Sequence, residues 1–355
     1  MKYKLLGNSG LRVSEICLGA MTFGEDWGWG STEEASGEMY KLFRDAGGNF
    51  IDTANVYTNG TSEEITGRLI RGERKNVVLA TKYTFSTKPG DPNAGGNHRK
   101  NMMQSLDDSL RRLGTDYIDL YWVHVWDEYT PIDEMMRALD DMVRAGKVLY
   151  VGISDAPAWV VSRANTIAEL RGWTGFAGIQ IEYSLVQRGA ERDLLPMARY
   201  MDVGITAWSP LGSGVLTGKY SSRGAGKKDS KRLEVWKDTF ESFAKQYLSE
   251  KNLKIADEVV KVAKELDRTP SQVALNWIRQ QPGRPIPIIG ATKPAHIEDN
   301  LKCVEFELSP QHLKRLDEVS AIELGFPQDF INMKEIKHML YGGTYDMIEK
   351  RKSEI

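Results

Sequence analysis

The chain has 355 residues, of which 41% are hydrophobic and 27% charged, with a formal net charge of −2 at neutral pH. This composition supports a large core and excludes an extensively disordered chain. The near-neutral balance gives no electrostatic basis for binding nucleic acid or an anionic membrane. Cys17 and Cys303 are the only cysteines, which argues against a disulfide framework and favours the cytoplasm. No apolar signal core or membrane-spanning stretch is expected.

Eight short apolar segments alternate with stretches of helical periodicity. Continuous apolar runs of this kind are typical of parallel strands buried on both faces. Eight alternations without a long linker favour a single (β/α)8 TIM barrel over an open sheet, although length alone also allows two domains. We expect one domain over residues 1–355. The predicted strands cover residues 16–19, 49–52, 77–81, 117–123, 148–153, 178–181, 203–208 and 286–289.

Several helix starts are predicted from local patterns. Apolar residues recur at helical spacing over 131–146. Thr130, Thr269 and Ser309 each precede a proline, so each is expected to cap a helix whose first residue is that proline. Ser31, followed three residues later by a glutamate, predicts a capping box.

Four segments do not follow the strand and helix alternation. Residues 1–15 predict an N-terminal hairpin that closes the bottom of the barrel. Residues 84–97 form a loop rich in glycine and proline after the third strand, and residues 212–250 form an insertion after the seventh. Because loops after strands lie on the catalytic rim, both extended rim loops are candidate lids. The C-terminal extension, residues 323–355, either folds over the rim or meets a neighbouring subunit, so a homo-oligomer is possible.

Four polar side chains lie close to the ends of the second, third and fourth predicted strands. They are Asp52, Tyr57, Lys82 and His124. In a closed barrel these strand ends share one rim, so a carboxylate, a phenol, an ammonium and an imidazole converge. Such a set can donate a proton to a carbonyl oxygen while a hydride arrives at its carbon. A neighbouring ammonium is expected to lower the pKa of the tyrosine from its ordinary value of ~10.

The chain resembles the aldo-keto reductase superfamily through DTANVYTNGTSEEITGRLI, LATK and RRLGTDYIDLYWVH. This resemblance implies a (β/α)8 barrel, a nicotinamide cofactor that is usually NADPH, and a small-molecule carbonyl substrate. It also implies a catalytic tetrad. Tyr57 would protonate the carbonyl oxygen, Lys82 would lower the pKa of Tyr57, Asp52 would hold Lys82, and His124 would position the carbonyl. The implied activity is NADP-dependent reduction of an aldehyde or ketone, and the reverse alcohol oxidation.

The resemblance implies cofactor ligands after the later strands. Ser154 and Asp155 match a Ser-Asn pair that holds the nicotinamide carboxamide, and Asp155 departs from it because a carboxylate has no NH2 to donate. Gln180 matches a second carboxamide ligand, and Trp208 the aromatic ring on which the nicotinamide stacks. Pyrophosphate contacts match Ser209, Leu211 and Lys219, with Pro210 and Gly212 in the same segment. The adenosine segment contains Gly290 and Thr292 near the ribose phosphate, Lys293 and His296 for a 2′-phosphate, and Asp299 and Asn300 near the adenine.

Aromatic residues on the predicted rim loops are the candidates for substrate contact, because they favour an apolar or ring-bearing ligand. They are Trp27, Trp29, Phe85 and Trp126. No zinc-ligand spacing occurs, so no metal is needed.

Two alternatives remain open at this point. WSPLGSGVLTGKY resembles the potassium-channel beta subunits, which are cofactor-binding regulatory proteins. His124 argues against that branch, because those subunits carry Asn there, and the rim loops resemble bacterial members. The other alternative is an NAD-dependent alcohol or sugar dehydrogenase.

Overall fold

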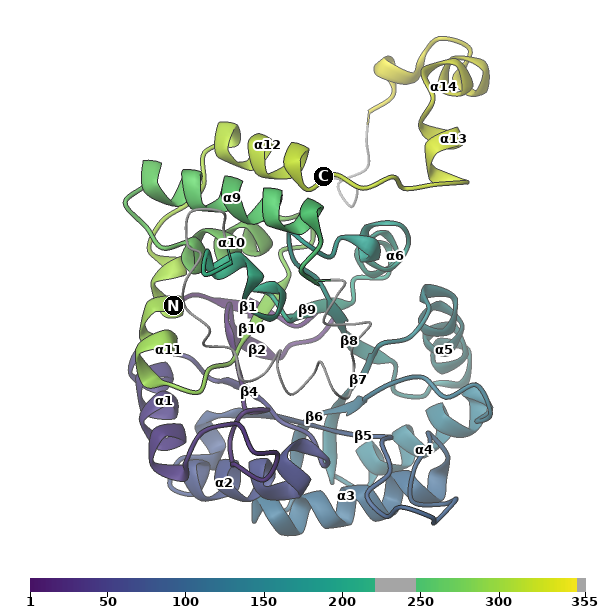
Figure 1. Ribbon diagram of the computed structural model, residues 1–355. Helices are drawn as coiled ribbons and strands as arrows, with labels where there is room; N and C mark the ends of the chain where they lie inside the picture. Colours follow the sequence, from purple (N-terminus) through teal and green to yellow (C-terminus); the bar gives the residue numbers. More distant parts are fainter. Residues whose placement is uncertain (221–246, 350–355) are drawn as a thin grey trace.

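The computed structural model describes residues 1–220 and 247–349, and its central feature is a closed barrel of eight parallel strands (Figure 1). The last strand pairs with the first, so no edge is left open. The (β/α)8 prediction and all eight predicted strands are confirmed. Lys82 lies inside its strand rather than after it, because that strand continues to Tyr83. The strands are β3 (Cys17–Gly19), β4 (Phe50–Asp52), β5 (Val78–Tyr83), β6 (Ile118–Val123), β7 (Val148–Ser154), β8 (Phe176–Glu182), β9 (Gly204–Trp208) and β10 (Ile286–Ile289).

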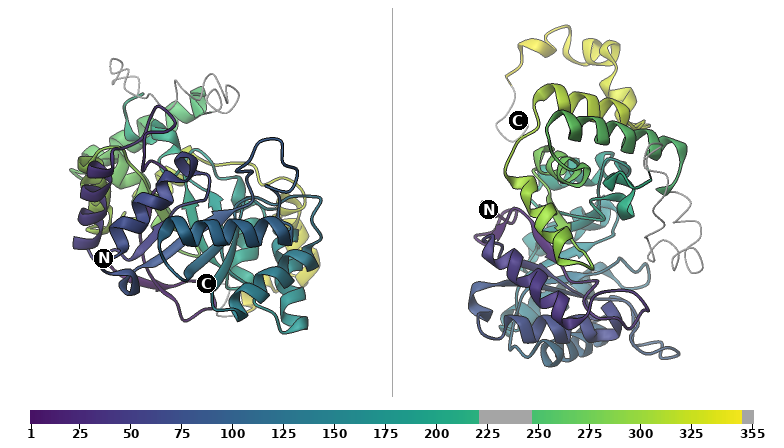
Figure 2. Two further views of the ribbon diagram at one scale, coloured as in Figure 1. Left: turned by 90° about the horizontal axis from the view of Figure 1, so that it is seen from below. Right: turned by 60° about the vertical axis from the view of Figure 1, so that its left-hand side comes forward.

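Helices surround the barrel and cover the outer faces of the strands (Figures 1 and 2). On α4, for example, Met135, Met136, Leu139 and Met142 are buried, as the helical spacing predicts. Among the described residues, no helix has the length and apolar character needed to cross a bilayer. The helices are α1 (Glu33–Asp45), α2 (Thr61–Ile70), α3 (Arg99–Leu113), α4 (Ile132–Arg144), α5 (Ala158–Arg171), α6 (Leu194–Tyr200), α9 (Glu250–Glu265), α10 (Pro270–Gln280), α11 (Pro294–Leu301), α12 (Pro310–Val319), α13 (Gln328–Asn332) and α14 (Lys334–Tyr341).

Two of the four predicted helix caps are confirmed. Thr269 forms a capping box at the start of α10, and Ser309 caps α12. The prediction for Thr130 was wrong, because its hydroxyl donates to a nearby aspartate at 2.6 Å and α4 begins after Pro131 without a side-chain cap. The capping box at Ser31 was also wrong: the next residue caps α1, while the Ser31 hydroxyl donates to a backbone carbonyl at 2.9 Å.

The predicted N-terminal hairpin is confirmed and closes the bottom of the barrel. Strands β1 (Tyr3–Leu5) and β2 (Arg12–Ser14) pair antiparallel. Leu6 and Val13 are fully buried and pack with the lower barrel side chains. The backbone NH of Asn8 donates to a carbonyl just before β9 at 2.6 Å, which joins the turn to the N-terminal end of that strand.

The barrel interior is filled by the indole of Trp122, which is fully buried. The ring fits because two neighbouring strands carry glycine where they face it. A Cβ atom added at Gly152 would lie 2.3 Å from a ring carbon, and one at Gly178 would lie 3.1 Å from another. The core of the barrel therefore depends on paired small and large residues, as close packing requires.

The described part of the C-terminal extension lies beside the barrel and not over its rim. Figure 1 shows α13 and α14 standing outside the ring of helices, beyond α12. Gln328 donates to the carbonyl of Arg192 at 2.7 Å and ties this extension to the barrel. Phe326, Met339 and Leu340 are exposed here. Contact with a neighbouring subunit stays a prediction. Most of the second predicted lid, residues 221–246, lies outside the described residues.

Substitution of Gly152 by Ala should lower the free energy of unfolding by about 1–3 kcal/mol, because the added methyl group overlaps the indole of Trp122. Urea denaturation of the two proteins measures the difference. Gly72→Ala is the matched control, since a Cβ there meets no atom within 4 Å. Equal midpoints for wild type and Gly152→Ala would show that the barrel interior relaxes freely around the ring.

Candidate active site

The ammonium of Lys82 is the centre of the candidate site at the carboxyl end of the barrel strands. Its Nζ donates to the carboxylate of Asp52, to the carbonyl of Thr53 at 2.8 Å and to the phenol oxygen of Tyr57 at 3.1 Å. Lys82 is fully buried and Asp52 is nearly so. The pairing follows from the fold, because β4 and β5 are neighbours in the barrel and both side chains stand at their carboxyl ends.

The backbone after β4 turns sharply to bring Tyr57 over Lys82. The short helix η1 (Tyr57–Gly60) contains Thr58 and Asn59 in the left-handed region, with φ of 45° and 57°. Such a conformation is uncommon for non-glycine residues and requires support. The buried hydroxyl of Thr58 supplies it by donating to the carbonyl of Phe23 at 2.7 Å.

His124 completes the group of four. It follows β6, and its backbone NH donates to the carbonyl of Tyr83 at 3.0 Å. Its ring stands edge-on to Tyr57, with centroids 5.6 Å apart, and its buried Nδ1 has no hydrogen-bond partner among the described residues. Burial, reinforced by the charge of Lys82, lowers the pKa of His124 well below its ordinary value, so the imidazole is neutral.

The pKa of Tyr57 is raised, contrary to the lowering predicted from the sequence. Burial is the largest influence and raises it, whereas the ammonium of Lys82 acts in the predicted direction but is outweighed. For Lys82 itself, burial would lower the pKa, but Asp52 and Tyr57 together raise it above the ordinary value. At neutral pH the site therefore holds a protonated phenol beside a charged ammonium.

A second group of polar side chains lies on the neighbouring strand ends β7, β8 and β9. Gln180 donates to Asp52 at 3.0 Å, so it contacts the tetrad directly. The indole NH of Trp208 donates to the carboxylate of Asp155 at 3.0 Å, and the backbone of Asp155 is left-handed, with φ of 42°. Ser154 is buried beside them. These residues, predicted from separate strands, lie together at one side of the rim.

The segment predicted to contact pyrophosphate folds into a tight turn after β9. Ser209 has φ of 51°, and its hydroxyl oxygen accepts from a backbone NH at 3.3 Å at the start of η4 (Gly212–Thr217). Pro210 and Gly212 are buried, whereas Leu211 and Lys219 are half-buried.

Tyr247 is a residue near this segment that the sequence did not indicate. Its hydroxyl lies 3.4 Å from that of Ser209 and donates to Glu182 at the end of β8. No local pattern marks this residue, since only the fold brings it beside the strand ends.

The predicted adenosine segment lies between β10 and the start of α11. Gly290, Thr292, Lys293 and His296 are exposed there, and Asn300 is buried. Both carboxylate oxygens of Asp299 accept hydrogen bonds from α10 and its cap, at 2.9 and 2.7 Å. Asp299 therefore links α10 and α11, and its place near an adenine stays a prediction.

The predicted aromatic residues divide into two groups. Trp27 stands edge-on to Tyr57 with ring centroids 6.4 Å apart, and the ring centroids of Phe85 and His124 are 4.6 Å apart. Trp29 packs behind Trp27 and is buried.

Trp126 forms the second aromatic group with Trp159, at a centroid distance of 5.5 Å. Trp159 is 57% exposed at the start of α5. It was not predicted as a site residue, because its sequence position is that of an ordinary residue in the first turn of a helix.

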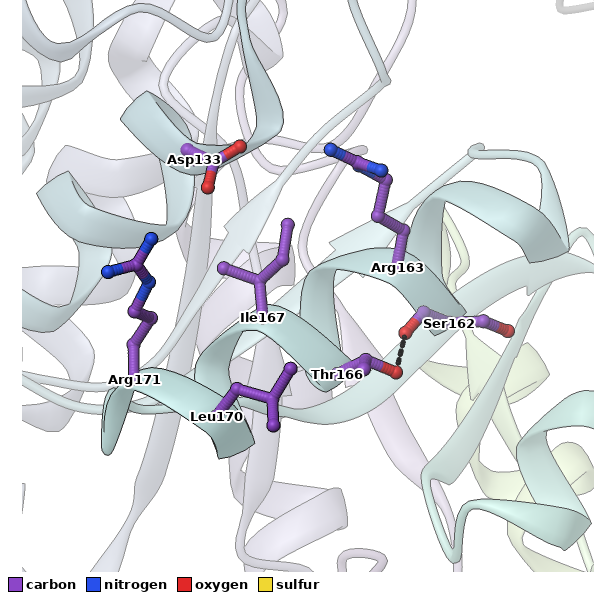
Figure 3. A pocket seen from close by; sticks show the side chains of 7 residues that line it. All are labelled: Asp133, Ser162, Arg163, Thr166, Ile167, Leu170 and Arg171. Atoms are coloured by element: carbon purple, nitrogen blue, oxygen red, sulfur yellow. Dashed lines mark hydrogen bonds between the residues drawn. The ribbon is translucent and has the colours of Figure 1, made fainter.

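A shallow groove on the outer wall of the barrel is separate from this site. It is formed between α4 and α5 and contains none of the predicted site residues. Figure 3 shows its lining side chains, Asp133, Ser162, Arg163, Thr166, Ile167, Leu170 and Arg171.

Substitution of Lys82 by Met should destabilise the protein by about 3–5 kcal/mol, because Asp52 would remain as a buried carboxylate without its cation. Urea unfolding measures the loss. The double variant Asp52→Asn, Lys82→Met should recover part of it, since no unpaired charge is then buried. A double variant that is no more stable than Lys82→Met would contradict the explanation.

Comparison with known proteins shows the family to which the chain belongs. The model of the Aldo/keto reductase family matches residues 15–321. The chain is 37% identical over 341 residues to the aryl-alcohol dehydrogenase (NADP(+)) of Phanerodontia chrysosporium, which covers 91% of this chain and 87% of that protein.

Two further fungal relatives have comparable similarity. The norsolorinic acid reductase of Aspergillus flavus is 34% identical over 337 residues, covering 92% of this chain and 83% of that protein. A putative aryl-alcohol dehydrogenase of Saccharomyces cerevisiae is 35% identical over 335 residues, covering 91% of this chain and 87% of that protein. The chain belongs to the Aldo/keto reductase family of oxidoreductases.

Proposed function

We propose that the protein reduces an aldehyde or ketone to an alcohol with NADPH, with Tyr57 as the general acid. The observation that carries the proposal is the position of Lys82, whose buried ammonium contacts both the Asp52 carboxylate and the Tyr57 phenol. A proton donor beside a fixed cation is the arrangement that carbonyl reduction requires, because a phenolate is left behind when the proton is given up.

Each member of the tetrad has a separate role in the proposed step. The bound cofactor supplies the hydride. Tyr57 is held in its protonated form and donates its proton to the carbonyl oxygen. Lys82, 3.1 Å from the phenol oxygen, stabilises the phenolate, and Asp52 keeps Lys82 in place and charged. The neutral ring of His124, which lies edge-on to Tyr57, would orient the carbonyl through a ring nitrogen.

The residues at the strand ends β7 to β9 fit a nicotinamide ring. Trp208 offers a half-buried indole face, and Ser154, Asp155 and Gln180 beside it offer the hydroxyl, carboxylate and amide groups that a carboxamide can hydrogen-bond. The turn from Ser209 to Lys219 and the start of α11 are the candidate contacts for the phosphates of the cofactor. The N-terminus of a helix attracts phosphate, which supports this role for α11. The Phanerodontia relative's name specifies NADP(+), which supports the same cofactor here.

The substrate class follows from the aromatic residues around the reacting groups. Trp27 and Phe85 stand beside Tyr57 and His124, and their rings favour an apolar or aromatic carbonyl compound. The names of the relatives, which refer to aryl alcohols and norsolorinic acid, are consistent with this class.

The two alternatives have less support. A regulatory role like that of the potassium-channel beta subunits does not require a neutral imidazole beside the phenol, and His124 supplies one. NAD dependence is distinguished by the relative affinities of the two cofactors. A cytoplasmic location stays a prediction, to which the two free and buried cysteines add support.

Substitution of Tyr57 by Phe should reduce kcat for an aromatic aldehyde by about 10²–10⁴-fold, because the acid is lost while the ring remains. Cofactor affinity should change little, since the phenol ring and its neighbours stay in place. The measurements are NADPH consumption with a panel of aromatic and aliphatic aldehydes, and cofactor binding by fluorescence titration.

Tyr129→Phe is the control for this substitution, since Tyr129 is 88% exposed on a loop. Turnover of Tyr57→Phe within a few-fold of wild type would remove Tyr57 from the acid role. Absence of turnover by wild type with every carbonyl in the panel would favour the regulatory alternative.

NADPH should bind more tightly than NADH, because Lys293 and His296 lie exposed at the start of α11, where a 2′-phosphate can accept charge-assisted hydrogen bonds. Each such bond is worth roughly 1.5–3 kcal/mol. The double variant Lys293→Ala, His296→Ala should lose most of the preference, measured as the ratio of the two dissociation constants. Equal affinities in wild type would instead support an NAD-dependent enzyme.

A further inference from the structure

Asp155 places a carboxylate at the rim beside the indole of Trp208, and no cation from residues 1–220 or 247–349 is bonded to it. Its Oδ1 accepts from the indole NH at 3.0 Å, and its own backbone NH donates to the carbonyl of Gln180 at 3.3 Å. The left-handed backbone at this residue, with φ of 42°, fixes the direction of the side chain. Hydrogen bonds from an indole and a serine hydroxyl hold the carboxylate without neutralising it.

The described groups around Asp155 leave a net negative charge when it is ionised. Lys82 is the cation that faces it, but Lys82 is already paired with Asp52. Glu182, at the end of β8, is a second carboxylate whose pKa is raised mainly by burial and further by Asp155. Tyr57 carries its proton at neutral pH, because burial raises its pKa. His124 is also uncharged.

We infer that Asp155 distinguishes the two redox states of the nicotinamide, stabilising the oxidised ring, which carries a positive charge, over the neutral reduced ring. The inference rests on the proposed function, which places the ring on Trp208. Opposite charges attract most strongly where little solvent screens them. Asp155 is exposed in the structure, so the attraction depends on the bound ring itself covering the carboxylate from solvent. A neutral amide at this position would offer the same hydrogen-bond acceptor to the indole but would give no such preference.

The substitution Asp155→Asn separates charge from shape. The asparagine oxygen can still accept from the indole NH of Trp208, while the negative charge is removed. Dissociation constants of NADP+ and NADPH are measured without substrate, by quenching of tryptophan fluorescence at pH 8. Asp155→Asn should weaken NADP+ binding about tenfold, equivalent to about 1.4 kcal/mol, and change NADPH binding less than about twofold. Asp133→Asn, an exposed change on the outer wall, is the control.

The pH dependence of wild type gives a second test that needs no variant. Burial raises the pKa of Asp155 to about 6, so the carboxylate is ionised at pH 8 and becomes neutral as the pH falls through 6. The ratio of NADP+ to NADPH affinity should therefore fall between pH 8 and pH 5. The 2′-phosphate also titrates in this range, but it is common to both cofactors and cancels in the ratio. Asp155→Asn should show a much flatter ratio.

The outcomes are distinct for the inference and for the proposed function. Equal weakening of both cofactors by Asp155→Asn, together with a wild-type ratio that does not change with pH, would overturn the inference and leave Asp155 as a hydrogen-bonding residue. Tighter NADP+ binding by the variant would also overturn it. Failure of wild type to bind either cofactor would instead overturn the proposed function. If Asp155→Asn fails to fold, the pH dependence of the affinity ratio in wild type decides between the two outcomes for the inference.

Discussion

The buried ammonium of Lys82 is the constraint on which the rest of the rim depends. A charge in this position is tolerated only when its donors are satisfied, and Asp52, Thr53 and Tyr57 satisfy all three. The same three bonds fix the spacing of β4, β5 and the turn between β4 and α2. The groups that would carry out the chemistry are therefore also the groups that hold this part of the barrel together.

The barrel beneath the rim supports this arrangement through packing rather than through charge. The indole of Trp122 fills the interior because Gly152 and Gly178 make room for it, and Leu6 of the hairpin closes the bottom. Since such a core is close-packed, the strand ends have little freedom to move apart. The barrel thus fixes Lys82 on β5, and the turn at η1 brings Tyr57 to within 3.1 Å of it.

The sequence predicted the features that follow from periodicity and from position along a strand. Eight apolar runs specified the barrel, and the places of the tetrad after three consecutive runs predicted their convergence. Features decided by competition between neighbours were missed. Thr130 was expected to cap α4, but its hydroxyl instead donates a hydrogen bond to an aspartate three residues earlier. The raised pKa of Tyr57 depends on how much protein surrounds it, which no local pattern reveals. Tyr247 and Trp159 reach the rim only through the fold.

The charges of the rim fall into two parts with different consequences. On the side of β4 and β5, Lys82 and Asp52 cancel, so the pair can support proton transfer without favouring either charge state of a bound ligand. On the side of β7 to β9, Asp155 and Glu182 are both acids, and no described cation bonds to either. Each carboxylate accepts a hydrogen bond from an aromatic residue, and such a bond offsets less of the negative charge than an ion pair would. Among the described residues, two carboxylates without a bonded cation therefore lie near Trp208, on the opposite side of the rim from the paired charges of Lys82 and Asp52.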